Sequence, residues 1–352
     1  MQASGGLARV VGWPTFLLDD IGSMKHVEGL LLAFVLLLAS PLASSADGTE
    51  AKGNPRHRVW EPASPVMQEP IWPVGTTIAP PASQGAERFS TQGKQIAGRG
   101  WTAVERVSEP TMSIYPPIGK NTGAAMVVFP GGGYRVLAID LEGTEVCDWV
   151  TRMGVTCVLL KYRVPGSGPW WSDACNCRQT PSVPMALQDA QRTISLLRKR
   201  ASELGVDPHR IGVVGFSAGG RMVADVSNHL ARSYADVDDA DRESMRPDFA
   251  IALYPGHLWK GPGLTLDAGL TISPDAPPTL IIQAGDDPTD DVRHSLTYYL
   301  ALQQAGVPVE LHLYAHGGHA FGLRETTEPV THWRLLAEKW MASLGVIPAR
   351  AE

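Results

Sequence analysis

Residues 211–220 constrain the fold of this chain more than any other segment. The first half of the segment is an apolar, β-branched run, which is typical of a buried strand. The run ends in Gly215-Phe-Ser-Ala-Gly219, and apolar residues then recur at helical spacing from Met222 to Leu230. A strand, a sharp turn and a helix therefore follow one another without a gap, with Ser217 at the apex of the turn.

This G-x-S-x-G turn between a strand and a helix predicts a nucleophile elbow. Small residues at positions 215 and 219 allow the strand and the helix to approach closely, while Ser217 takes a strained backbone conformation. The hydroxyl group of Ser217 is then lifted clear of the sheet, where a base can reach it. The alternative is a glycine-rich turn whose serine caps the next helix, because a chain with 36 glycines can produce the pattern by chance.

The rest of the chain alternates between strand-like and helix-like segments. After short β-like stretches within 104–115, we expect strands at 125–129, 155–162, 249–254, 279–283 and 309–314, and helices at 142–153, 187–204, 292–305 and 333–344. Repeated β-α alternation predicts an α/β fold with a mostly parallel central sheet and helices on both faces. In such a sheet the functional groups lie beyond the carboxyl ends of the strands.

Three side chains that follow predicted strands occur in the order of an α/β-hydrolase triad, Ser217, Asp286 and His319. Serine is a poor nucleophile at neutral pH, so it needs an imidazole to take its proton and a carboxylate to fix the imidazole tautomer. We assign Ser217 as the nucleophile, His319 as the general base and Asp286 as the residue that orients His319.

Neighbouring residues compete for two of these roles. Asp287, Asp290 and Asp291 lie in the same loop as Asp286, and Asp287 is its closest rival. We favour Asp286 because it comes first after the strand. His316 competes with His319, which we favour because the two glycines before it suit a loop that must present a ring.

The first strand of the α/β pattern runs directly into Pro130-Gly-Gly-Gly-Tyr134. Consecutive backbone amides without side chains at the end of a strand can form an oxyanion hole. We therefore predict that the amides of Gly132, Gly133 and Ala218 bind the oxyanion and that Tyr134 contacts substrate. A phosphate loop is disfavoured because no Gly-Lys-Ser/Thr follows, and an ordinary glycine turn remains the alternative.

The N-terminal region predicts export. Met24-Lys-His26 precedes an apolar stretch at 30–39 and the small-residue run 43–46, which together describe a secretory signal peptide. The apolar stretch is too short to span a bilayer comfortably, and an uncleaved anchor is the alternative. Met24 is then the expected start of translation, and a periplasmic or secreted protein is expected.

Three regions follow from these assignments: 1–46 as extension and signal peptide, 47–100 as an extended Pro/Gly-rich leader, and 101–346 as the catalytic domain. The leader is expected to wrap the domain or to stay mobile. The formal charge of −6 and the lack of a basic cluster argue against a nucleic-acid partner. The sequence predicts no membrane anchor and gives no expectation of the oligomeric state.

The four cysteines allow three full pairings in an oxidising compartment. Cys147 and Cys157 fall in a predicted helix and strand, where they can equally be buried small hydrophobic residues. Cys175 and Cys177 are too close in sequence for an easy bridge, and no nearby histidines suggest a zinc site. The pairing therefore stays open, and we expect no metal and no organic cofactor.

Several motifs together resemble the acetylxylan esterase and feruloyl esterase-like branch of the α/β-hydrolases over residues 104–345. They are Phe129-Pro-Gly-Gly-Gly-Tyr134, Glu142-Gly143, Lys161-Tyr-Arg163, Gly215-Phe-Ser-Ala-Gly-Gly220, Asp286-Asp-Pro288 and Gly317-Gly-His-Ala-Phe-Gly322. The resemblance implies a secreted serine esterase that removes acetyl or feruloyl groups from plant polysaccharides or oligosaccharides through an acyl-enzyme. Arg221, where such proteins often have histidine, and Ala320, in place of a third glycine, depart from the pattern and leave the substrate open.

Two other functions remain as alternatives. A prolyl-oligopeptidase-like exopeptidase has a similar triad order, but the N-terminal region is too short for a β-propeller. A non-catalytic binding protein on the same fold is disfavoured because all three triad residue types are present. The aromatic rings of Trp170, Trp171 and Trp259 are candidates for sugar stacking, and local packing is the alternative.

Overall fold

The computed structural model describes residues 59–77, 85–164, 170–172, 177–179 and 183–349, with the backbone alone described in 170–172 and 177–179. The chain divides into two compact units, Met1–Lys52 and Gly53–Glu352, and all described residues belong to the second. The predicted signal peptide therefore lies outside the described residues. Within the described ranges, no helix is both long enough and apolar enough to cross a bilayer.

An eight-stranded sheet forms the centre of the unit, with the strand order β1-β4-β7-β5-β10-β11-β12-β13. Its strands are β1 (Gln68–Pro70), β4 (Thr111–Tyr115), β5 (Ala125–Phe129), β7 (Thr156–Lys161), β10 (Ile211–Phe216), β11 (Phe249–Leu253), β12 (Thr279–Ala284) and β13 (Val309–Tyr314). The six strands from β7 to β13 run parallel, whereas β4 pairs antiparallel with β7 and β1 antiparallel with β4. This arrangement confirms the predicted α/β fold with a mostly parallel sheet.

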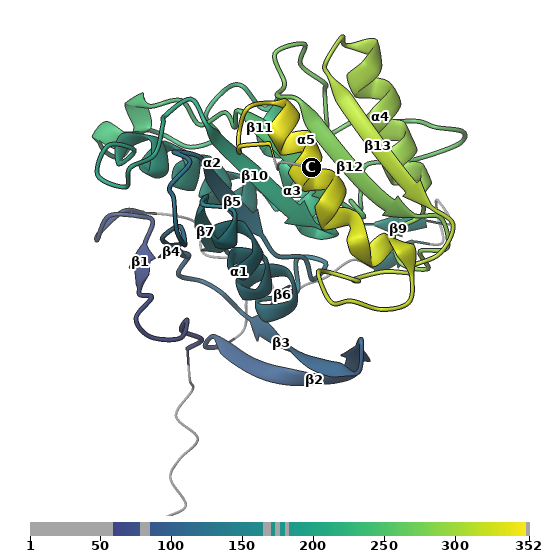
Figure 1. Ribbon diagram of the computed structural model, residues 1–352, viewed down its shortest axis with the longest axis horizontal. Coiled ribbons are helices and arrows are strands. Elements are labelled where there is room, and N and C mark those ends of the chain that lie inside the picture. The colour runs from purple at the N-terminus through teal and green to yellow at the C-terminus, as the bar shows by residue number, and fades with distance from the viewer. Residues whose placement is uncertain (1–58, 78–84, 165–169, 173–176, 180–182, 350–352) are drawn as a thin grey trace, which may run out of the picture. The chain divides into compact units, whose positions relative to one another are not determined.

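Helices cover both faces of the sheet (Figure 1). They are α1 (Glu145–Arg152), α2 (Pro184–Lys199), α3 (Ala218–Asn228), α4 (Arg293–Gln304) and α5 (Trp333–Ser343), with short helical turns η1 (Asp140–Thr144), η2 (Asp239–Arg242) and η3 (Pro329–His332). Helices α1 and α5 lie together in front of the strands in Figure 1, and the ring centroids of Trp149 and Trp333 are 5.2 Å apart. Helix α3 contacts α4 through a hydrogen bond of 3.3 Å from Asn228 to Tyr298.

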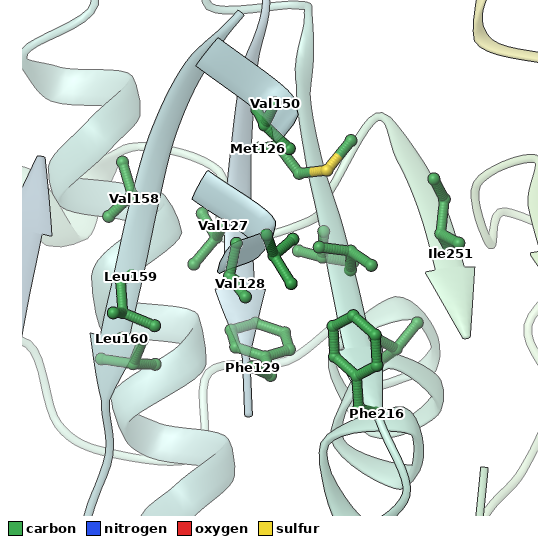
Figure 2. Packing of buried hydrophobic residues seen from close by; sticks show 14 of the residues in the cluster. Met126, Val127, Val128, Phe129, Val150, Val158, Leu159, Leu160, Phe216 and Ile251 are labelled. Atoms are coloured by element: carbon green, nitrogen blue, oxygen red, sulfur yellow. The ribbon is translucent and has the colours of Figure 1, made fainter. Parts of the chain in front are cut away.

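The burial of the parallel strands in the core explains why the sequence predicted them. Every residue of β5, β7, β10, β11 and β12 is buried. Because helices cover both faces, such strands read as continuous apolar runs instead of alternating ones. Figure 2 shows the side chains of β5, including Phe129, packed between those of β7 and those of β10 and β11.

The segment expected to be an extended leader contributes strands to the unit. Strand β1 extends the main sheet beside β4, and β2 (Arg88–Ile96) pairs with β3 (Arg99–Glu105) in a three-stranded sheet completed by β6 (Val136–Ala138). Two further strands, β8 (Trp170–Ser172) and β9 (Cys177–Gln179), pair with each other. The described part of the leader therefore packs onto the domain.

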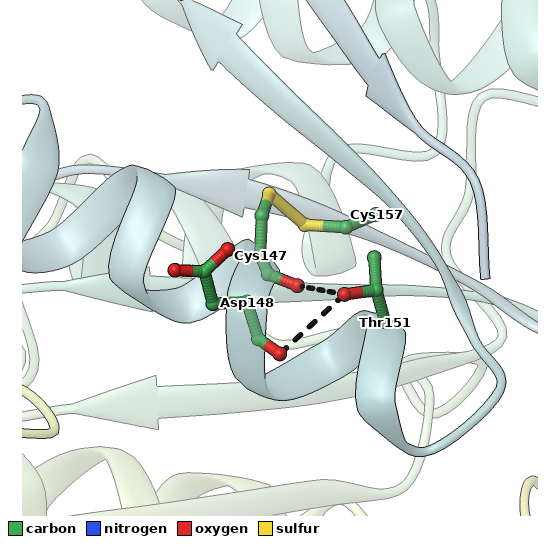
Figure 3. The surroundings of a disulfide bond; sticks show 4 residues. All are labelled: Cys147, Asp148, Thr151 and Cys157. Atoms are coloured by element: carbon green, nitrogen blue, oxygen red, sulfur yellow. Dashed lines mark hydrogen bonds between the residues drawn. A yellow bond between two sulfur atoms is a disulfide. The ribbon is translucent and has the colours of Figure 1, made fainter. Parts of the chain in front are cut away.

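A disulfide bond joins Cys147 of α1 to Cys157 of β7 (Figure 3), with Cα atoms 5.3 Å apart. The Thr151 hydroxyl group donates a hydrogen bond of 2.8 Å to the carbonyl oxygen of Cys147. The disulfide bond joins residues that are 10 apart in the sequence. For a loop of this length, the loss of chain entropy in the unfolded state stabilises the folded state by about 3 kcal/mol. Cys175 lies outside the described residues, as does the side chain of Cys177.

Candidate active site

The turn between β10 and α3 has the geometry of a nucleophile elbow. Ser217 has a φ of +52° and a ψ of −115°, a left-handed conformation that side chains rarely adopt. A Cβ atom on Gly215 would overlap the carbonyl oxygen of Gly219, and one on Gly219 would overlap the carbonyl oxygen of Phe129. The glycines on either side of Ser217 are therefore required by close backbone approach, as the sequence predicted.

The structure brings His319 to Ser217. The Nε2 atom of His319 lies 3.1 Å from the Ser217 hydroxyl oxygen. The Nδ1 atom of the same ring lies 2.7 Å from a carboxylate oxygen of Asp287. Because the Asp287 carboxylate accepts a hydrogen bond, the proton of the neutral ring lies on Nδ1, and Nε2 is left to accept the serine proton. His316, the rival of His319, does not contact Ser217 in the described structure.

The expectation that Asp286 orients His319 is wrong. Asp286 turns outward, where its carboxylate accepts a hydrogen bond of 2.8 Å from the Gly318 amide and lies 3.3 Å from His316. Asp287 points inward instead, and its side chain is fully buried. The amides of Thr289 and Asp290 donate to its second oxygen at 2.8 and 3.0 Å. The turn after β12 therefore selects the second aspartate of the pair.

The surroundings of His319 favour its protonated form. Burial of the ring opposes the charge, but the hydrogen bond with Asp287 and the negative charges of Asp290, Asp287 and Glu142 outweigh it. Together they raise the pKa of His319 above the ordinary histidine value of 6.5. A ring with this pKa becomes a base only as the pH rises through that value.

The glycine loop after β5 lies beside the elbow. Its closeness is shown by Gly131, where an added Cβ atom would lie 3.0 Å from the Cβ of Ser217. Gly132 and Gly133 have φ angles of +130° and +62°. Ala218, whose amide is the third predicted donor, is the first residue of α3. Amides in the first turn of a helix lack intrahelical partners and lie at the positive end of the helix dipole.

Tyr134, the predicted substrate contact, closes the glycine loop with a φ of +57°. Its ring is buried, with centroids 6.4 Å from Tyr162 and 6.1 Å from His257. The hydroxyl group of Tyr162 donates a hydrogen bond of 2.6 Å to the carbonyl oxygen of Pro130. Tyr162 and His257 therefore contact the two ends of segment 130–134, Tyr162 at Pro130 and both at Tyr134.

Glu142 is a functional candidate that the sequence marks only as part of the Glu142-Gly143 motif. One of its carboxylate oxygens accepts the Gly131 amide at 2.8 Å, and the other accepts the Tyr254 hydroxyl group at 2.8 Å. The ring of Tyr254 packs against His319 with centroids 4.9 Å apart. Glu142, whose pKa is raised by burial, thus connects the glycine loop to the histidine. Glu142 is buried together with Leu141 and Gly143, and the Glu142-Gly143 motif was the signal available in the sequence.

We expect Glu142→Ala to lower kcat for ester hydrolysis by about 100-fold, with a smaller change in KM. Alanine removes both acceptor oxygens, so the Gly131 amide and the Tyr254 hydroxyl group lose their shared partner and the glycine loop loses its anchor. A misplaced oxyanion donor typically costs on the order of 100-fold in kcat. Steady-state kinetics test this, with Glu145→Ala, which removes an ion pair to Arg324 nearby, as the control. Equal kcat values for the two variants would contradict the anchoring role.

The sequence profile for the α/β hydrolase fold matches residues 126–271. The crystal structure of an acetyl ester-xyloside bifunctional hydrolase from Caldicellulosiruptor lactoaceticus is 33% identical, with a TM-score of 0.58, over 68% of this chain and 89% of that chain. This chain belongs to the α/β-hydrolase family. The predicted family and fold class are therefore confirmed.

Two curated relatives carry the names of ester hydrolases. An acetylxylan esterase from Xylanibacter ruminicola is 27% identical over 57% of this chain and 42% of that protein. An ethyl acetate hydrolase from Pseudomonas putida is 27% identical over 56% of this chain and 66% of that protein. The matched region therefore spans less than two thirds of the length of both relatives.

The two departures from the expected α/β-hydrolase motifs have structural explanations. Arg221, at the start of α3, pairs with Asp225 at 2.9 Å and with Asp267 at 3.4 Å. Ala320 has a φ of +63°, which explains why a glycine is usual at this position. Neither residue displaces the contacts among Ser217, His319 and Asp287. Among the described residues, no group of acidic, histidine or cysteine side chains is arranged to hold a metal ion.

Proposed function

We propose that this α/β-hydrolase is a secreted serine esterase that removes acetyl or other small acyl groups from plant polysaccharide or oligosaccharide fragments. The observation that carries the proposal is the chain of contacts from the Ser217 hydroxyl group to His319 at 3.1 Å and from His319 to Asp287 at 2.7 Å. Such a chain activates a serine for acyl transfer.

In the proposed reaction, His319 accepts the hydroxyl proton as the Ser217 oxygen attacks the ester carbonyl carbon. The amides of Gly132, Gly133 and Ala218 bind the oxyanion of the tetrahedral intermediate, and each donor contributes on the order of 3 kcal/mol. The alcohol leaves with the proton from His319. A water molecule then gives a proton to the same ring and attacks the acyl-enzyme, which releases the acid and the free serine.

The substrate class is supported by the names of two relatives, an acetylxylan esterase and an acetyl ester-xyloside hydrolase. Trp259 offers less support as a sugar-stacking face. The guanidinium group of Arg293 lies 3.7 Å from the centre of its ring, and its indole N–H donates to the Gly263 carbonyl oxygen at 2.6 Å. These contacts favour local packing. The side chains of Trp170 and Trp171 lie outside the described residues, so their stacking role stays a prediction.

Export is supported by the apolar stretch at 30–39 and by the disulfide bond between Cys147 and Cys157. Disulfide bonds persist in oxidising compartments and are rare in reducing ones. We accordingly propose that the protein starts at Met24, loses residues up to about 46, and acts as a periplasmic or secreted enzyme.

The deciding experiment measures acetate release from acetylated xylo-oligosaccharides by the protein started at Met24, with Ser217→Ala as the inactive control. A peptidyl anilide is assayed in parallel. We expect acetate release by the wild type alone and no anilide cleavage. Cleavage of the anilide without acetate release would mean that the protein is a peptidase and not an esterase. Turnover of neither substrate by folded protein would refute the proposed function.

A further inference from the structure

A second carboxylate faces the nucleophile. Asp290 lies in the loop after β12 and is 3% exposed. Its Oδ2 atom accepts a hydrogen bond of 3.0 Å from the Ser217 hydroxyl group and lies 3.8 Å from the Nε2 atom of His319. Asp287 holds the opposite nitrogen of the same ring at 2.7 Å. The imidazole therefore has a carboxylate beside each of its two nitrogens.

The position of Asp290 is fixed by its surroundings. Its amide donates to Asp287 at 3.0 Å, and its carbonyl oxygen accepts a hydrogen bond of 3.1 Å from Gln283. A Cβ atom on Gly256 would lie 2.5 Å from the Asp290 carboxylate, so only glycine leaves room for the side chain. The same loop that presents Asp287 to one edge of His319 thus presents Asp290 to the other edge.

The two acceptors compete for one proton. The Ser217 hydroxyl group carries a single hydrogen, which can be donated to Asp290 or to Nε2 of His319. When it is donated to Asp290, the contact of 3.1 Å between Nε2 and the serine oxygen is satisfied by a proton on Nε2. The ring is then an imidazolium and cannot act as a base. When the ring is neutral, Nε2 accepts the serine proton and the site is competent.

We propose that Asp290 is a fourth catalytic residue, which binds the Ser217 hydroxyl group in the free enzyme and sets the pH at which His319 becomes a competent base. The proposal rests on the proposed serine-esterase function. During acyl transfer the proton moves from Ser217 to His319 and then to the leaving alcohol. Asp290 takes no proton and stabilises the imidazolium together with Asp287.

Several other groups face the His319 ring, and each must be weighed against Asp290. Asp287 comes from the same loop, Glu142 from η1 and the Tyr254 ring from the segment after β11. Burial lowers the pKa of His319, whereas Asp287, Asp290 and Glu142 raise it. Among the three carboxylates, Asp290 is the one that also accepts the hydrogen bond of the nucleophile.

We expect Asp290→Asn to move the acidic limb of the kcat/KM profile to lower pH by about one unit or more, because an opposite charge within 4–6 Å typically shifts a pKa by that amount. We also expect the activity plateau at neutral pH to fall, since the imidazolium formed in the reaction loses one of its carboxylates. The profile is measured with p-nitrophenyl acetate. Asp291→Asn is the matched control, because Asp291 is the next residue and pairs with Arg293 at the surface.

Titration of 15N-labelled histidine by NMR provides a readout that needs no turnover. We expect the His319 ring to titrate above the ordinary histidine value in the wild type and lower in Asp290→Asn. A wild-type His319 that titrates at or below the ordinary value would overturn the proposal, even if the variant does not fold. Equal shifts in Asp290→Asn and Asp291→Asn would also overturn it. Failure of the proposed esterase function would give a different result, namely a wild-type protein that does not hydrolyse p-nitrophenyl acetate.

Discussion

Replacing Ser217 by alanine should lower kcat for acetyl ester hydrolysis by about a millionfold, which is the usual cost of losing the nucleophile of such a triad. Alanine has no oxygen to attack the carbonyl carbon, so His319 and the oxyanion donors can only assist direct attack by water. The fold should be unaffected, because the lost hydroxyl group contacts only His319 and Asp290 among the described residues. We therefore expect the Ser217→Ala variant to fold normally and to show no measurable turnover.

The control is Ser227→Ala in the same helix α3. The hydroxyl group of Ser227 is buried and has no hydrogen-bond partner among the described residues, so its removal should change neither kcat nor the melting temperature. Both variants are assayed with p-nitrophenyl acetate and with acetylated xylo-oligosaccharides, after circular dichroism has established folding. If Ser217→Ala keeps about a tenth of the wild-type kcat, another group carries the acyl transfer.

The parts of the fold that the sequence predicted are those with a local signal. The strands β5, β7, β10, β11 and β12 are buried from end to end and mostly apolar, because helices cover both of their faces. The elbow was equally visible, because its glycines are dictated by backbone contacts within residues 215–219 and with β5. The three residues of β1 carry no such pattern, and only their pairing with Thr111–Ser113 makes them a strand.

The functional residues that were missed or misassigned depend on contacts between distant segments. Glu142 gains its role from Tyr254, which is 112 residues away in the chain. The pairing of Cys147 with Cys157 depends on the packing of α1 against β7, which periodicity does not reveal. Asp290 was considered only as a rival acid, because its approach to Ser217 follows from the path of the loop after β12.

The choice between Asp286 and Asp287 shows why neighbouring residues are hard to separate by sequence. The rule that the first residue after the strand faces the site assumes that the strand geometry continues. Here the chain turns at once, and the amides of Thr289 and Asp290 bind the second carboxylate and hold it inward. The same turn leaves the first carboxylate in solvent, where the Gly318 amide lowers its pKa.

Asp287→Asn should lower kcat for acetyl ester hydrolysis by about 10⁴-fold, whereas Asp286→Asn should change it by no more than about threefold. An asparagine at 287 presents an amide N–H to Nδ1 of His319 and so places the ring proton on Nε2. That tautomer cannot accept the Ser217 proton. Asp286 contacts only His316 and the Gly318 amide in the described structure, so its amide variant leaves the ring of His319 unchanged.

Parallel measurement of the two variants separates a role in orienting the base from a general effect of charge, because each replacement removes one negative charge from the same loop. Single-turnover kinetics with p-nitrophenyl acetate report the acylation step, in which the tautomer of His319 matters. Similar losses in both variants would mean that the loop charge, and not the contact with Nδ1, supports acylation. A loss confined to Asp286→Asn would instead require the loop to rearrange when substrate binds, so that the outer carboxylate replaces the inner one.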